Sequence, residues 1–186
     1  QAHLPLLLGV LGLLFLIHII NVLLGYRLLA LGIYPRRPFG LVGIVCAPFL
    51  HGNFNHLFFN AIPLFVLMDF MLIYSENVWF SATCSIFLIS GFLTWLFGRK
   101  AFHVGASSVI TGYWGFLVFF MIQQPNALSI IMGILCIYYF AGIFFGILPF
   151  RKSTSWEGHL FGLIAGIATA WGMTIPALYP FFRFFM

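Results

Sequence analysis

Long apolar runs separated by short polar connections make up most of the chain. The six runs with few or no charged residues are Leu4–Leu24, Phe54–Ile73, Val78–Phe97, Ser107–Ile122, Ala127–Leu148 and Gly158–Ala177. A helix needs about 20 consecutive apolar residues to cross the hydrocarbon core of a bilayer. The pattern therefore predicts an all-α membrane protein with six transmembrane helices.

A further apolar stretch, Phe39–Leu50, is too short to span and contains three glycines or prolines. We expect a non-helical loop that lies in the membrane interface or packs against the bundle, because such backbone is tolerated at membrane depth only when protein or water satisfies it. The connection Gly25–Asn53 is then long, and every other connection is short. Residues 1–186 are predicted to form a single domain, a six-helix bundle with an interfacial loop between its first and second helices.

Composition supports the membrane assignment. Of the 186 residues, 63% are hydrophobic and 6% are charged, and the mean hydropathy is +1.11. A soluble domain of this length could not bury so much apolar surface. The composition therefore excludes a soluble globular protein.

The polar minority suggests neither nucleic-acid binding nor a metal centre. The net charge of +5 comes from cations in connections and at chain ends, where lysine and arginine contact lipid headgroups and anchor helices. No basic patch interleaved with aromatic residues is present. Cys46, Cys84 and Cys136 are far apart in apolar surroundings, which favours free buried thiols over disulfides or metal ligands. No metal or cofactor is predicted.

The start of the second run, HGNFNHLFFN, is rich in polar side chains. His51, Asn55, His56 and Asn60 fall within ten residues. His56 and Asn60 are spaced i, i+4 and share one helix face. They either pair with neighbouring backbone, as many intramembrane polar groups do, or donate hydrogen bonds to an oxyanion.

The fourth run begins with a serine pair in GASSVITG. Ser107 follows Gly105 with one residue between them, at the start of an apolar helix. A serine at such a position commonly caps the helix. A serine within the bilayer that water can reach is also a candidate nucleophile. Ser108, Gly112 and Gly115 form a stripe of small residues that permits close approach of another helix.

The sixth run supplies a matching surface. Gly158, Gly162 and Gly166 repeat every four residues, and His159 shares a face with the last two. Small residues at this spacing let two transmembrane backbones come close, so His159 can reach a short side chain on the partner helix. Histidine is suited to accept a serine proton near neutral pH. Glu157 is adjacent in sequence but faces elsewhere, so a serine hydrolase here would use a dyad.

Together these motifs resemble the rhomboid family of intramembrane serine proteases. The matching residues are His51, His56 and Asn60 of HxxxxHxxxN, Gly105 and Ser107 of GxS, and Gly158, His159, Gly162 and Gly166 of GHxxGxxxG. They occur in the family's order on the second, fourth and sixth runs, and the resemblance covers essentially the whole chain.

The resemblance implies specific roles. Ser107 would be the nucleophile and His159 the general base. His56, Asn60 and the Ser107 backbone N–H would form the oxyanion hole, and His51 would support the polar network beside it. The substrates would be transmembrane segments of other proteins, and the location would be a bacterial inner membrane.

Three positions depart from the family pattern. Ser108 stands where GxSG has its second glycine, which leaves two adjacent serines, and the spacing favours Ser107. Thr111 replaces the aromatic residue that usually stacks on the catalytic histidine, so the imidazole must be held in another way. The Trp-Arg pair common in the first loop is absent, and Arg36 and Arg37 lie nearer the loop's start.

Orientation is contested within the sequence. Seven of the eight lysines and arginines lie in the first, third and fifth connections, which the positive-inside rule assigns to the cytoplasm. Similarity to bacterial rhomboids implies the opposite. We expect these connections to face outward, because three spaced motifs are more specific than a charge count.

Three other functions fit the sequence less well. An inactive rhomboid-like protein that binds transmembrane clients is disfavoured by the intact Ser107 and His159. A small transporter with a polar cluster that includes Asp69 is disfavoured because hydropathy shows no internal repeat. A metalloprotease is disfavoured because no HExxH motif occurs.

Overall fold

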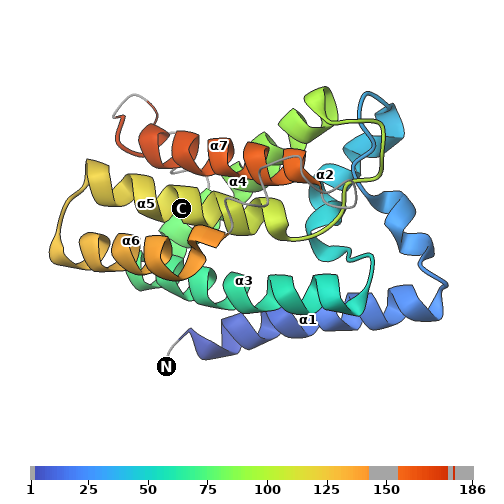
Figure 1. Cartoon of the computed structure of the whole chain (residues 1–186), viewed down its shortest axis with the longest axis horizontal. Helices are drawn as coiled ribbons and strands as arrows, with labels where there is room; N and C mark the ends of the chain where they lie inside the picture. Colours follow the sequence, from blue (N-terminus) through green and yellow to red (C-terminus); the bar gives the residue numbers. More distant parts are fainter. Residues whose placement is uncertain (1–2, 143–154, 176–177, 179–186) are drawn as a thin grey trace.

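The computed structural model describes residues 3–142, 155–175 and 178, and within these ranges the regular structure is almost entirely helical (Figure 1). The long helices are α1 (Leu4–Leu23), α3 (Phe54–Tyr74), α4 (Glu76–Phe97), α5 (Ser107–Gln123), α6 (Ala127–Phe140) and α7 (Trp156–Gly172). They confirm the prediction of an all-α membrane bundle, and each begins within two residues of a predicted apolar run.

Side-chain caps define where several helices begin. Asn53 accepts from the backbone N–H of His56 at 2.8 Å, and Asn126 and Ser129 form a reciprocal capping box at α6. Ser75 accepts from the N–H of Asn77 at 3.2 Å, so α4 begins at Glu76, two residues before the predicted Val78. A carboxylate in the first turn is favoured by the helix dipole, which explains the earlier start.

The helices differ in length. α1, α3 and α4 have 20, 21 and 22 residues and are long and apolar enough to cross a membrane. α5 and α7 have 17 residues each, which is the lower limit for a span. The described part of α6 has 14 residues. The ends of the predicted runs Ala127–Leu148 and Gly158–Ala177 lie outside the described residues.

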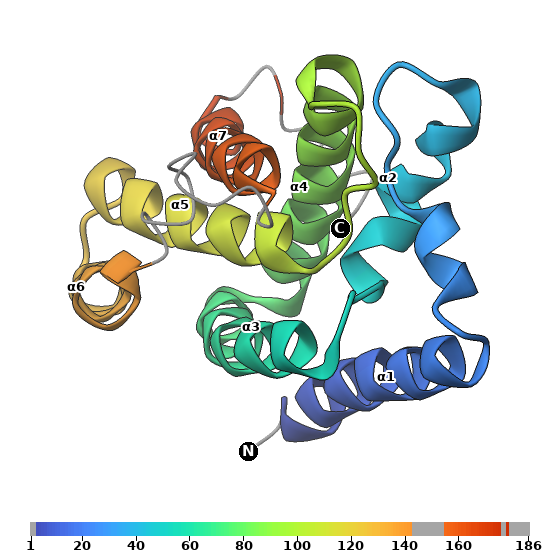
Figure 2. The ribbon, with the colours of Figure 1, turned by 45° about the vertical axis from the view of Figure 1, so that its right-hand side comes forward.

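α5 is the central helix of the bundle. It contacts α3, α4, α6 and α7, which surround it in Figure 2. Its residues 109–117 are all buried, including the aromatic side chains of Tyr113, Trp114 and Phe116. α1 packs mainly on α3, and only 22% of its apolar window is buried. α1 therefore faces lipid along most of its surface, whereas α5 is enclosed by protein.

The three cysteines are free, as predicted. Cys136 is fully buried in α6, and its backbone carbonyl accepts a hydrogen bond from the indole N–H of Trp114 at 3.0 Å. Cys46 and Cys84 are half-buried. None of them lines the cavity described below.

The segment between α1 and α3 is not a non-helical loop. It forms the short helices η1 (Arg27–Leu31), η2 (Pro38–Leu41), α2 (Gly43–Cys46) and η3 (Ala47–Phe49), so the expectation for Phe39–Leu50 was wrong on this point. Short helical turns satisfy backbone groups locally, which suits a segment at membrane depth. As expected, the segment packs against the bundle: Ile44 of α2 fills the space beside Gly91 of α4.

Candidate active site

Ser107 stands at the first turn of α5, after a tight approach of the chain to α3. Gly105 has a φ of +118°, and a β-carbon there would lie 2.7 Å from the imidazole of His56. Only glycine tolerates both this backbone conformation and this contact. The N-cap of α5 is Ala106, and no side chain caps the helix. The interpretation of Ser107 as a capping residue is therefore wrong.

The small residues of α5 and α7 bring the two helices into backbone contact. A β-carbon at Gly162 would overlap the carbonyl oxygen of Ser108, and one at Gly166 would overlap the carbonyl oxygen of Gly112. At Gly115 the approach is less tight, with the β-carbon position 3.0 Å from the carbonyl oxygen of Leu163. This is the close packing that the two glycine stripes predicted.

Ser107 and His159 line one cavity of about 460 Å³, together with His56 of α3. The rest of its wall comes from the start of α3, the connection between α4 and α5, and the N-cap of α7, namely Gly52, Asn53, Arg99, Ala101, Phe102, His103, Val104 and Ser155. Three of the predicted site residues therefore face a common space at the end of the bundle where α5 and α7 begin.

The imidazole of His159 is held by a hydrogen bond. Its Nδ1 lies 3.0 Å from the backbone carbonyl oxygen of Ser155, one helical turn earlier. A carbonyl oxygen can only accept, so Nδ1 carries the proton and Nε2 keeps the free lone pair of the neutral ring. This hydrogen bond orients the His159 ring, as stacking on an aromatic side chain at position 111 would.

Thr111 has a different role. Its hydroxyl donates to the carbonyl oxygens of Ser107 at 3.0 Å and Ser108 at 3.1 Å. The same oxygen faces Gly162 of α7. A larger side chain at position 111 would separate α5 from α7, so the departure from the family pattern is consistent with this close packing.

Hydrogen-bond donors gather on the α3 side of Ser107. The amide nitrogen of Asn60 is 3.4 Å from the β-carbon position at Gly105. That nitrogen is buried and lacks a hydrogen-bond partner within the described ranges. Asn60 does not line the cavity and lies next to Gly105. His56 both lines the cavity and approaches Gly105.

Most backbone N–H groups around the start of α5 already donate a hydrogen bond. Gly105 N–H donates to the Ala47 carbonyl at 2.9 Å, and the N–H groups of Val109 and Ile110 donate to the Ala106 carbonyl at 2.9 and 3.0 Å. In the part of the chain that the structure describes, the Ser107 N–H has no such backbone acceptor, as expected at a helix N-terminus. It is available to a negatively charged oxygen, and the helix dipole favours that charge.

His51 lies behind the site and is fully buried. Its Nε2 accepts from the Ala106 N–H at 3.4 Å, and its ring meets that of His56 edge-on with centroids 5.1 Å apart. Burial, followed by the nearby charge of His56, lowers the pKa of His51 to about 3. At neutral pH it is an uncharged acceptor that fixes the turn before Ser107.

Glu157 does not form a triad with His159. Its carboxylate is buried and lies 3.4 Å from Nε of Arg99, and it accepts from the Arg99 backbone N–H at 3.3 Å. Glu157 therefore ties the connection between α4 and α5 to the start of α7. The sequence argument expected only that Glu157 does not face His159, and the contact with Arg99 comes from the tertiary structure.

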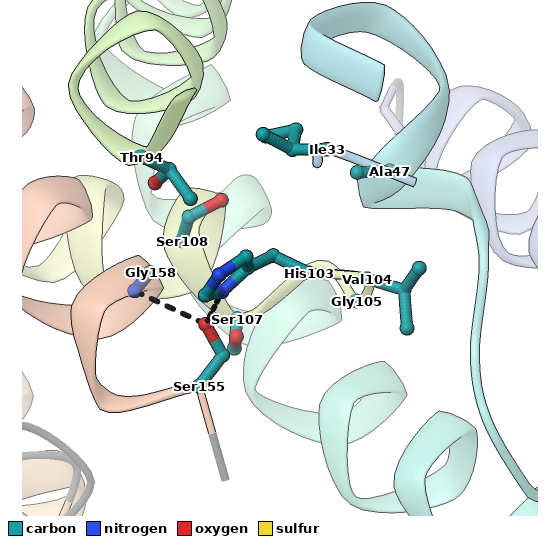
Figure 3. A pocket seen from close by; sticks show the side chains of 10 residues that line it. All are labelled: Ile33, Ala47, Thr94, His103, Val104, Gly105, Ser107, Ser108, Ser155 and Gly158. Atoms are coloured by element: carbon teal, nitrogen blue, oxygen red, sulfur yellow. Dashed lines mark hydrogen bonds between the residues drawn. The ribbon is translucent and has the colours of Figure 1, made fainter. Parts of the chain in front are cut away.

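Two polar residues at the site were not identified from the sequence. Ser155 caps α7 and accepts from the Gly158 N–H at 3.3 Å, and His103 contacts the Ser155 hydroxyl at 2.6 Å (Figure 3). Ser155 could have been found, because a serine two residues before Glu157 is a helix-start signal. His103 lies in an irregular connection, where no periodic pattern reveals which way a side chain points.

Comparison with known proteins agrees with the motif analysis. The family model for the rhomboid domain matches residues 38–175. An uncharacterized protein of Mycobacterium tuberculosis (strain H37Rv) is 36% identical over 89% of this chain and 72% of its own length, and one of Mycobacterium leprae is 31% identical over 89% and 69%. The match to the family model covers well over half of the chain, which therefore belongs to the rhomboid family.

Proposed function

We propose that this protein is an intramembrane serine endopeptidase in which Ser107 is the nucleophile and His159 the general base. The observation that carries the proposal is that these two residues, 52 positions apart in sequence and on different helices, line the same cavity. The Nδ1 bond of His159 to Ser155 supports it, because it leaves Nε2 as the proton acceptor.

The reaction would follow the course of acyl transfer by an activated serine. The Ser107 oxygen attacks the carbonyl carbon of the scissile bond while His159 takes the hydroxyl proton. His159 then gives that proton to the departing amine, and an ester links Ser107 to the new carboxyl end. A water molecule deprotonated by His159 hydrolyses the ester and restores the enzyme.

The negative charge of the tetrahedral intermediate needs nearby donors. The Asn60 amide and the His56 ring of α3 lie beside Gly105, and the Ser107 N–H stands at the start of α5. In this role they act mainly in the transition state, when the carbonyl oxygen becomes an oxyanion. The unpartnered amide nitrogen of Asn60 supports the assignment, because a buried donor without an acceptor is costly in the resting protein.

The position of the cavity bears on the substrate. It lies where α5 and α7 begin, among polar residues of the connections, and water can enter there. A transmembrane helix would have to unwind locally before one of its carbonyl groups reached Ser107, since helical carbonyls are internally bonded. We expect cleavage near helix-destabilising or small residues of membrane proteins, in a bacterial inner membrane.

The test is covalent labelling with a serine-directed electrophile, such as a fluorophosphonate, followed by intact mass measurement of the protein in detergent. The wild type should gain one adduct, and Ser107→Ala should gain none. Ser108→Ala is the matched control, because Ser108 is the adjacent serine on the same helix turn, and it should still be labelled. Labelling of Ser107→Ala at the wild-type rate would refute the assigned nucleophile. A wild type that neither reacts nor cleaves would favour the inactive, client-binding alternative.

A further inference from the structure

His103 stands where three segments of the chain meet. Its backbone forms an antiparallel bridge with Ile33, with N–H to carbonyl distances of 2.9 and 3.0 Å, which joins the segment before α3 to the one before α5. Its side chain is 4% exposed and points toward the start of α7 (Figure 3). A buried polar ring at such a junction requires partners for both of its nitrogens.

Both ring nitrogens of His103 have partners, and these partners set its protonation. Nε2 is 3.0 Å from the backbone carbonyl oxygen of Arg99, so Nε2 carries a proton. Burial is the largest influence on His103 and lowers its pKa, which favours the neutral ring. Nδ1 of the neutral ring is then an acceptor, and the Ser155 hydroxyl, 2.6 Å away, donates to it.

Ser155 is fully engaged as a result. Its hydroxyl proton goes to His103, and its hydroxyl oxygen accepts the Gly158 N–H at 3.3 Å. Its backbone carbonyl oxygen accepts from Nδ1 of His159 at 3.0 Å and from the His159 backbone N–H at 3.4 Å. Hydrogen bonds therefore link the Arg99 carbonyl to His103, His103 to the Ser155 hydroxyl, and the Ser155 backbone carbonyl to the ring of His159.

We infer that His103 is a positioning residue for catalysis: through Ser155 it fixes the carbonyl group that holds the His159 ring with Nδ1 protonated and Nε2 free to accept a proton. The inference rests on the proposed function. Each of these hydrogen bonds has one donor and one acceptor, so the direction of every bond is fixed. The last of them, from Nδ1 of His159 to the Ser155 carbonyl, selects the ring tautomer of His159. No other side chain in the described residues is hydrogen-bonded to the ring of His159.

The contact with His103 is separate from the capping of α7. A serine cap needs only its oxygen, which the Gly158 N–H uses. The hydroxyl proton adds nothing to the cap, yet it is directed at a buried histidine from another segment. This second bond ties Ser155 to the connection that leads into α5, so it links the segment before the base to the segment before the nucleophile.

The experiment measures kcat and KM on a transmembrane substrate in detergent. Ser155→Ala and His103→Leu should each lower kcat by about 10- to 100-fold, the usual cost of losing a group that orients a functional histidine. KM should change much less than kcat, because the hydrogen bonds that these changes remove hold His159 rather than the substrate. Ser155→Thr keeps the hydroxyl, and His103→Asn keeps an acceptor near the position of Nδ1. Both should restore much of the lost rate.

Three controls separate positioning from simple destabilisation. Ser75→Ala removes a comparable cap from α4, away from the cavity, and should leave kcat near the wild-type value. The double variant Ser155→Ala, His103→Leu should be no slower than the worse single variant, because both break one chain. Nitrogen-15 NMR of histidine-labelled protein should show the Nδ1-protonated ring of His159 in the wild type and its loss in Ser155→Ala.

The possible failures are distinguishable. Unchanged kcat in Ser155→Ala and His103→Leu, in a protein that still requires Ser107, would overturn the inference and leave the proposed function intact. Activity that survives Ser107→Ala would overturn the proposed function itself. If His103→Leu does not fold, the comparison of Ser155→Ala with Ser155→Thr decides the matter, and equal kcat in the two would refute the inference.

Discussion

Gly162 of α7 faces the carbonyl oxygen of Ser108 of α5 so closely that a β-carbon has no space between them. The contact lies three residues after His159 on one helix and one residue after Ser107 on the other. The distance between nucleophile and base is therefore set by backbone-to-backbone packing. A long side chain at this point would move the two catalytic candidates apart.

Gly162→Ala should lower both activity and thermal stability. The added methyl group would meet the Thr111 hydroxyl and the Ser108 carbonyl oxygen, and the carbonyl cannot move without shifting a helix. Overpacking of this kind typically costs about 1 to 3 kcal/mol. Thermal unfolding in detergent and substrate cleavage would measure the two effects. Gly12→Ala in α1 is the matched control, since nothing lies within 4 Å of its β-carbon position. A Gly162→Ala protein as stable as Gly12→Ala would contradict the packing argument.

Asn60→Ala should lower kcat far more than it changes KM. Its amide nitrogen is buried beside Gly105 without a partner in the described structure, and an oxyanion donor acts chiefly in the transition state. Loss of one such donor typically costs about 10² to 10³ in rate. Steady-state kinetics should show the split, with Asn55→Ala, an exposed asparagine of the same helix, near the wild type. A change confined to KM would argue for a role in substrate binding.

Stability should fall in acid because of His51. Its pKa is lowered from 6.5 to about 3 by burial, so between these values the unfolded chain binds a proton that the folded protein excludes. The free energy of unfolding therefore decreases as the pH falls through this window and is insensitive to His51 above it. Thermal unfolding of the wild type and His51→Gln at several pH values should show a shallower dependence in the variant. Some dependence should remain, because burial also lowers the pKa of His103. If the stability of the wild type and of His51→Gln depended on pH in the same way, His51 would not be a source of the acid sensitivity.

The connections at the mouth of the cavity should face the outside of the cell. Two of the cations that the positive-inside rule would count are engaged in the fold: Arg36 donates to the Leu96 carbonyl at 3.0 Å, and Arg99 pairs with Glu157. In a background without native cysteines, Arg37→Cys and Lys100→Cys should react with a membrane-impermeant maleimide on intact spheroplasts. Gln124→Cys, after the other end of α5, should react only after lysis. The reverse pattern would show that the charge count sets the orientation.

Hydropathy and local spacing determined much of this protein in advance. A run of apolar residues long enough for a bilayer must be helical there, because lipid offers no partners for backbone groups. α3 begins after Asn53, whose side chain caps it, and α5 begins after Gly105, where the backbone takes a positive φ. The pairing of His56 with Asn60, and of His159 with the glycine stripe, follows from helix periodicity alone. These local rules brought the serine pair and His159 into consideration, and the spacing of the family motif then selected Ser107 over Ser108.

Tertiary structure decided what periodicity cannot encode. The helical turns of the segment before α3 depend on packing against α4, and composition alone had suggested a loop. The hydrogen bond that replaces aromatic stacking on His159 comes from the backbone carbonyl of Ser155, which no side-chain motif reveals. His103 acquires its place only when the segments that contain Ile33, His103 and Ser155 come together. Contacts between irregular segments far apart in sequence are set by how the whole bundle packs. For this reason the sequence alone did not identify His103 as a residue of the site.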